Sequence, residues 1–169
     1  MARGLVRATV AEVAGCAADE VGLHQRCPRC GGPHGRLFVT VGSEPGPAVS
    51  LTHAGDLSIV AVASRPVGVD VEPLAAGGRR RDADELRRWV RTEAVLKATG
   101  HGLEVDPSLL EVVDRPAGPH LVRWDGPGRR PVLQIADLGA ASGYLAAVAR
   151  AGRRPLRLDI AEARLSAGR

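Results

Sequence analysis

Residues 67–72 read Val-Gly-Val-Asp-Val-Glu, and the alternation in this stretch decides how the rest of the chain is interpreted. Side chains at positions i and i+2 lie on the same face of a strand. Asp70 and Glu72 are therefore expected to point the same way, about 7 Å apart, while the three valines point into a core. The stretch predicts a strand that presents two neighbouring carboxylates.

A helix is predicted downstream, because residues 86–97 have apolar side chains at helical spacing. Its inward stripe contains Leu86, Val90, Glu93 and Lys97. Its opposite face contains Arg87, Arg88 and Arg91. An isolated charge is costly to bury, so we expect Glu93 and Lys97 to have partners inside the protein.

Asp70, Glu72 and Glu93 form the predicted metal site. Three converging carboxylates repel one another unless a hard divalent cation lies between them, and oxygen ligands of this kind suit Mg²⁺. Lys97 beside such an ion suits an anionic substrate, most simply a phosphate. The alternative is structural: Glu93 and Lys97 form an i,i+4 ion pair on a core helix, and both strand carboxylates are solvated.

Lys97 is also unusual in composition. The chain has 23 basic residues, and Lys97 is its only lysine. Lysine presents a compact point charge on a slim stem, whereas arginine presents a broad planar fork. The single lysine at an inward position favours the functional interpretation over the structural one.

Four segments resemble, in the same order, the motifs of one family. They are Cys30–Gly35 (CGGPHG), Ser50–Gly55 (SLTHAG), Val67–Glu72 (VGVDVE) and Trp89–Leu103 (WVRTEAVLKATGHGL). The last two resemble the paired signature of the 4′-phosphopantetheinyl transferases. The arrangement resembles the larger, surfactin-synthetase-activating type, although the chain is shorter than that type before residue 5 and in the linker over residues 73–85.

The resemblance implies an enzyme that moves the 4′-phosphopantetheine arm of coenzyme A to a serine of an acyl or peptidyl carrier protein. Such carriers serve polyketide or non-ribosomal peptide biosynthesis. The resemblance also implies that Asp70, Glu72 and Glu93 hold Mg²⁺. Glu93 would take the serine proton, and Lys97 would bind the transferred phosphoryl group.

Three further residues are expected at the coenzyme A end of the site. By resemblance, His53 faces the 3′-phosphate of the cofactor and Arg7 faces the nucleotide phosphates. The family commonly has a basic residue where this chain has Gly32, so Arg36 is expected to substitute for it.

The resemblance implies an α+β fold of two similar halves, each with a small antiparallel sheet and a packed helix, and a site in the cleft between them. The predicted halves are residues 1–74 and 75–169. An internal echo agrees with this, because two predicted hairpins, one over residues 58–71 and one over residues 145–160, have similar sequences.

Two other functions remain open. His24, Cys27, Cys30 and His34 have the spacing H-x2-C-x2-C-x3-H, which could bind zinc in a nucleic-acid-binding module. That module would leave Glu93 and Lys97 unexplained, and it lacks the interleaved aromatics of a single-strand binder. The third possibility is a transferase homologue that has lost activity, suggested by the shortened segments and by Thr92, where the family often has lysine.

Composition restricts the class of protein without choosing a partner. The 169 residues are 44% hydrophobic, which is enough for a core, and the net charge of +4 favours acidic partners such as nucleic acid, membrane headgroups, polyphosphate cofactors or acidic proteins. Three cysteines argue against a disulfide framework, and no apolar run could span a bilayer. We expect a cytoplasmic monomer that binds neither membranes nor nucleic acid.

Overall fold

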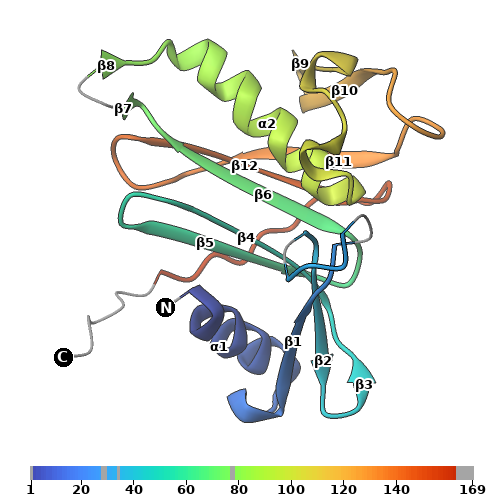
Figure 1. Cartoon of the computed structure of the whole chain (residues 1–169). Helices are drawn as coiled ribbons and strands as arrows, with labels where there is room; N and C mark the ends of the chain where they lie inside the picture. The colour runs from blue at the N-terminus through green and yellow to red at the C-terminus, as the bar shows by residue number, and fades with distance from the viewer. Residues whose placement is uncertain (1, 28–29, 34, 77–78, 163–169) are drawn as a thin grey trace.

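The computed structural model describes residues 2–27, 30–33, 35–76 and 79–162 of the chain. Within them the fold is α+β, as predicted, with two α-helices and several small antiparallel sheets (Figure 1). The helices are α1 (Ala2–Ala14) and α2 (Ala83–Thr99), and the short 3₁₀ turns are η1 (Ala18–Glu20), η2 (Gly102–Glu104) and η3 (Pro107–Leu109). The strands are β1 (Val21–Gln25), β2 (Leu37–Val41), β3 (Glu44–Pro45), β4 (Ala48–Ala54), β5 (Leu57–Ala63), β6 (Val67–Pro73), β7 (Ala75–Ala76), β8 (Arg79–Arg80), β9 (Leu110–Arg115), β10 (Gly118–Trp124), β11 (Leu133–Leu138) and β12 (Tyr144–Ala151).

Helix α1 covers a first apolar core. It lies against β1 and the β4–β5 hairpin (Figure 1). The buried members of this core are Val6, Val10, Ala11, Val21, Leu23, Val39 and Val49. Apolar residues at helical spacing along α1 face these strands.

Helix α2 covers a second core, on the sheet with strand order β11-β12-β6 (Figure 1). The buried members of this core are Val90, Ala94, Val95, Leu96, Ala98, Val105, Leu110, Val112, Ile135, Ala147 and Ala149. Strands β9 and β10 form a separate two-stranded sheet that also packs against it. The predicted carboxylate strand, β6, therefore lies at the edge of the sheet beneath α2.

Residue size explains how closely α2 approaches β6. Gly68 and Asp70 lie opposite Ala149 and Ala147 of β12, so these four residues share the face beneath the helix. A Cβ atom on Gly68 would overlap the backbone of α2 and lie 2.8 Å from the Cβ of Lys97. The absence of a side chain at Gly68 therefore lets α2 lie directly on the strand.

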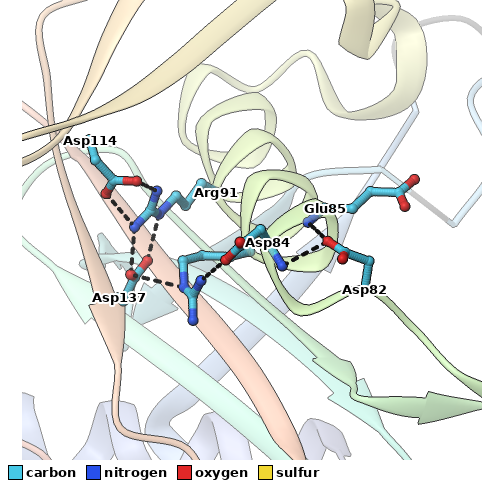
Figure 2. A network of polar contacts seen from close by, with 7 residues as sticks. Asp82, Asp84, Glu85, Arg91, Asp114 and Asp137 are labelled. Carbon is cyan, nitrogen blue, oxygen red and sulfur yellow. Dashed lines mark hydrogen bonds and ion pairs between the residues drawn. The ribbon is translucent and has the colours of Figure 1, made fainter.

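The ends of α2 are fixed by its own sequence. Asp82 is the N-cap, and its Oδ1 accepts hydrogen bonds from the backbone N–H groups of Asp84 and Glu85, as Figure 2 shows. Gly100 ends the helix in the left-handed conformation, with φ of 82°. These caps place Glu93 and Lys97 in the second half of the helix, over β6.

The expectation that Arg91 faces outward is wrong. Arg91 is only 3% exposed, and its guanidinium lies between Asp137 of β11 and Asp114 of β9 (Figure 2). Its Nε and Nη2 donate to the two carboxylate oxygens of Asp137, each at 2.7 Å, in a bidentate pair. The helical period identified the face of α2 that packs on one sheet. It could not show that β9 and β11 also cover the helix, because their aspartates lie far from Arg91 in the sequence.

Two strand predictions are also wrong. Strand β5 does not form a hairpin with β6; it pairs with β4, and β6 pairs with β12. Residues 156–160 form no regular structure, so the second hairpin of the internal echo is missing. Alternating patterns identify strands but not their partners. The arrangement in two similar halves is therefore not confirmed, and β6, from the first predicted half, forms a sheet with strands of the second.

Candidate functional site

The candidate site lies where β6 meets α2 and β4. Asp70, in the middle of β6, is 5% exposed. Its Oδ1 accepts hydrogen bonds from Lys97 Nζ at 2.6 Å and from Thr52 Oγ1 at 3.2 Å. Its Oδ2 is buried and has no hydrogen-bond partner within the described residues. Two donors thus hold one oxygen of the carboxylate and leave the other for a ligand.

At this edge of β6, side chains form the hydrogen bonds that the backbone of a neighbouring strand would otherwise form. The N–H of Val69 donates to Ser50 Oγ at 3.1 Å, and the carbonyl of Val69 accepts from Lys97 Nζ at 3.2 Å. Strand β4 runs beside β6, but the described parts of the two strands form no backbone ladder. Ser50 and Lys97 thus form hydrogen bonds with the backbone of β6, and Thr52 and Lys97 form hydrogen bonds with the Asp70 carboxylate.

Glu93 lies on the same side of α2 and is 7% exposed, as the inward stripe predicted. The alternative interpretation required a Glu93–Lys97 ion pair, yet the ion pair that Lys97 makes is with Asp70. Glu93 Oε1 is buried, and no hydrogen-bond donor reaches it among the described residues. Glu93 is thus a buried carboxylate, one oxygen of which has no hydrogen-bond partner among the described residues.

Burial and charge together raise the pKa values of both acids. Burial raises the pKa of Glu93 above its usual range, and the nearby charges of Asp70 and Glu72 raise it further, against the opposing effect of Lys97. Burial also raises the pKa of Asp70, although Lys97 and Thr52 favour its ionised form. The two acids therefore bind protons more strongly than exposed carboxylates do.

Glu72, the second carboxylate of β6, is held by an arginine. Arg81 Nη1 lies 2.7 Å from Glu72 Oε2, and both side chains are partly exposed. No three His, Cys, Asp or Glu side chains of the described chain come together as a metal-binding group. Of the three predicted ligands, Asp70 and Glu93 each have a buried oxygen without a hydrogen-bond partner among the described residues, and carboxylate oxygen is the ligand type that suits a hard cation, whereas Glu72 is engaged by Arg81.

The predicted coenzyme A residues come from parts of the chain other than β6 and α2. Arg7 donates from Nε to the carbonyl of Val21 at 3.0 Å, on β1. Arg36 lies against the C-cap of α2, where its Nη1 would be 2.9 Å from a Cβ on Gly100, and its guanidinium is 5.9 Å from the ring centre of Phe38. His53 follows Thr52 on β4 and is exposed.

The zinc motif is only partly covered by the structure. Within the described residues, Cys27 is buried, Cys30 is exposed, and His24 Nε2 lies 3.3 Å from Thr40 Oγ1. His34 lies outside the described residues. The zinc hypothesis therefore stays a prediction.

Sequence reasoning missed Ser50 and Thr52 as site residues. Both are buried polar residues, 8% and 6% exposed. A signal was present, because a serine and a threonine at i and i+2 must share one face of β4, and buried hydroxyls need partners. Their actual partners, on β6, could not be read from local sequence.

No model of a known protein family matches the chain, and a search of the curated proteins finds no match either. Among the helices that the structure describes, none is both long enough and apolar enough to cross a bilayer.

Replacing Thr52 with valine tests whether its hydroxyl holds Asp70. Valine keeps the shape but removes the donor to Asp70 Oδ1. We expect the free energy of unfolding, measured by urea denaturation, to fall by about 1.5 kcal/mol, since a hydrogen bond to a charged group is lost. Thr52→Ser, which keeps the hydroxyl, is the control. Equal stability of the valine variant and the parent would mean that Thr52 does not support the carboxylate.

Proposed function

We propose that the chain is a Mg²⁺-dependent 4′-phosphopantetheinyl transferase that modifies an acyl or peptidyl carrier protein. The observation that carries this proposal is the pairing of Asp70 with Lys97 beside Glu93, with a buried, unpartnered oxygen on each acid. A purely structural ion pair would not explain why one buried oxygen of each acid has no hydrogen-bond partner among the described residues. The order of the motifs along the chain gives independent support.

The reaction joins the carrier serine oxygen to the β-phosphorus of coenzyme A. The bond from that phosphorus to the bridging oxygen breaks, and 3′,5′-adenosine bisphosphate leaves. Asp70, Glu72 and Glu93 would hold Mg²⁺, which supplies charge neutralisation to the pyrophosphate when bound. For Glu72 this requires release from Arg81, a partly exposed pair that costs little to open.

Glu93 would accept the serine proton, directly or through water. Its raised pKa suits this role, because a general base is most effective when its pKa approaches the working pH. Lys97 would bind an oxygen of the transferred phosphoryl group. Two described acceptors, Asp70 Oδ1 and the Val69 carbonyl, occupy the ammonium, and an ammonium has three N–H donors, so one is left for the substrate.

His53, Arg7 and Arg36 would bind the nucleotide end of coenzyme A. His53 is adjacent to Thr52 on β4, so the strand that holds the nucleotide would be the strand that orients Asp70. In this proposal the fold has two related halves, residues 1–74 and 75–169, with the site between them. The enzyme would act as a cytoplasmic monomer in polyketide or non-ribosomal peptide biosynthesis.

The test is to incubate the protein with coenzyme A, Mg²⁺ and a panel of apo carrier proteins, and to weigh the carriers by mass spectrometry. We expect one or more carriers to gain a single phosphopantetheine arm, and to gain none when Mg²⁺ is removed by a chelator. Asp70→Asn should abolish the gain. If no carrier gains mass, and calorimetry detects no binding of coenzyme A with Mg²⁺, the transferase assignment is wrong.

A further inference from the structure

Two identical tetrapeptides lie at one end of the sheet under α2. Gly-Arg-Arg-Pro occurs at residues 128–131, before β11, and again at residues 152–155, after β12. Both glycines have positive φ, 76° and 122°, so both segments begin as turns. Strands β11 and β12 are antiparallel, with Leu133 opposite Ala151 (Figure 1), and Gly152 N–H donates to the carbonyl of Val132 at 2.9 Å. The two turns therefore leave the sheet side by side.

The turns gather an uncompensated positive charge, which we call the arginine cap. Its members are Arg65, Arg129, Arg130, Arg150, Arg153 and Arg154. Arg65 joins the cap from the β5–β6 connection, where its Cδ would lie 3.4 Å from a Cβ on Gly152. In the described part of the chain, none of the six forms an ion pair with an acid, and together they exceed the net charge of +4 of the whole protein.

Internal hydrogen bonds shape this cap. Arg150 donates from Nη2 to the carbonyl of Arg154 at 2.6 Å, which fixes the second turn on the end of β12. Arg130 donates from Nη1 to the carbonyl of Val122 at 2.8 Å, which fixes the first turn against β10. Arg129, Arg153 and Arg154 are exposed, and their side chains form no hydrogen bond with the described residues. Three guanidinium groups thus point into solvent from turns that internal hydrogen bonds hold in place.

An exposed aliphatic side chain accompanies the arginines. Val132, directly after the first turn, is 48% exposed and is one of the five large hydrophobic side chains that are most exposed among the described residues. Its carbonyl accepts the hydrogen bond from Gly152 N–H, so Val132 lies between the two turns. Arginine beside exposed aliphatic residues is typical of a surface that binds the headgroup region of a membrane.

We propose that the arginine cap binds the surface of an anionic phospholipid membrane. Guanidinium forks match lipid phosphates, and Val132 enters the boundary between headgroups and acyl chains. Nucleic acid fits the surface less well, because the cap contains no aromatic side chain on which the bases of a single strand could stack, and a duplex would give the exposed Val132 no role. The proposal does not depend on transferase activity. It concerns binding to a membrane surface, and it adds to the expected partners one that the sequence did not predict.

Co-sedimentation with vesicles tests the proposal. The vesicles are phosphatidylcholine alone and phosphatidylcholine with phosphatidylglycerol, and the proteins are the parent, Arg153→Gln/Arg154→Gln and the control Arg26→Gln/Arg115→Gln. Arg26 and Arg115 are exposed arginines outside the cap, so both variants lose the same net charge. We expect the parent and the control to bind only the anionic vesicles, and less in high salt. Affinity should fall by about 25-fold in the cap variant, at about fivefold per arginine.

Three outcomes would overturn the proposal. The first is that the parent does not sediment with anionic vesicles. The second is that the two variants lose affinity equally, which would show that net charge alone acts. Binding to a DNA duplex, followed by fluorescence anisotropy and lost only in the cap variant while vesicle binding is absent, would assign the cap to nucleic acid. Val132→Ser, which keeps every charge, should weaken vesicle binding severalfold and leave DNA binding unchanged.

Discussion

Glu93→Gln is expected to lower the rate of carrier loading about a hundredfold or more, because it removes the proposed base. Glutamine has a helix propensity close to that of glutamate, so α2 should remain formed. The variant should also be more stable than the parent at pH 8. The parent must bury the Glu93 carboxylate beside Asp70 and Glu72, and the raised pKa of Glu93 records the cost of ionising it there.

The pH dependence of this difference has a definite sign. Glu93 ionises at a lower pH in the unfolded chain, at the usual pKa of an exposed glutamate, than in the folded protein, where burial raises its pKa. The unfolded state therefore loses its proton first, and the parent loses stability as pH rises through the interval between the two pKa values. Glutamine cannot ionise, so the advantage of the variant should grow through that interval and disappear in acid.

Urea denaturation at several pH values and carrier loading measure the two effects separately. Glu85→Gln is the control, since Glu85 is exposed in the first turn of the same helix. An active Glu93→Gln variant would show that Glu93 is not the base. A variant less stable than the parent at pH 8 would show that the Glu93 carboxylate is paired in solution and not strained by burial.

Gly68→Ala should produce the largest loss of stability of any single methyl group added to the site. The new Cβ would overlap backbone atoms of Ala94 and Ala98, and backbone cannot rotate away as a side chain can. Overpacking of this kind typically costs up to about 3 kcal/mol, and here α2 must move away from β6. That movement would separate Lys97 from Asp70, so carrier loading should fall as well.

Gly139→Ala is the matched control, because a Cβ at Gly139 meets no atom within 4 Å. Urea denaturation should give a free energy of unfolding near that of the parent for Gly139→Ala and one lower by about 3 kcal/mol for Gly68→Ala. Normal stability of Gly68→Ala would mean that the helix and the strand lie farther apart in solution than in this structure.

Local sequence was sufficient to predict the main elements of the site. The alternation over residues 67–72 predicted β6 with buried valines, and Val67, Val69 and Val71 are each at most 4% exposed. The helical period predicted that Glu93 lies inward on α2. Both predictions succeed because the backbone geometry of a strand or helix fixes which side chains share a face.

Partners distant in sequence could not be predicted in the same way. Periodicity showed that Lys97 needed a partner, but not that Asp70 would supply it in place of Glu93 four residues away. It placed Arg91 on the outer face because nothing near it in sequence indicates Asp114 or Asp137. Strand pairing failed similarly, since the apolar pattern of β5 suits β4 and β6 equally well. The similarity between residues 58–71 and residues 145–160 reflects similar composition and not a repeated hairpin, because residues 156–160 form no strand.

The junction of β4 with β6 should allow a motion that an ordinary sheet does not. Their hydrogen bonds are made by two side chains of β4 in place of a ladder of backbone bonds: the Ser50 hydroxyl accepts from the Val69 N–H, and the Thr52 hydroxyl donates to Asp70. We therefore expect the β4–β5 hairpin to separate from β6 more readily than a strand held by a backbone ladder, since no backbone hydrogen bonds of either sheet need to break. Hydrogen exchange of the Val69 amide should then be faster than that of the amides bonded between β6 and β12, and it should slow when a ligand bridges the two strands.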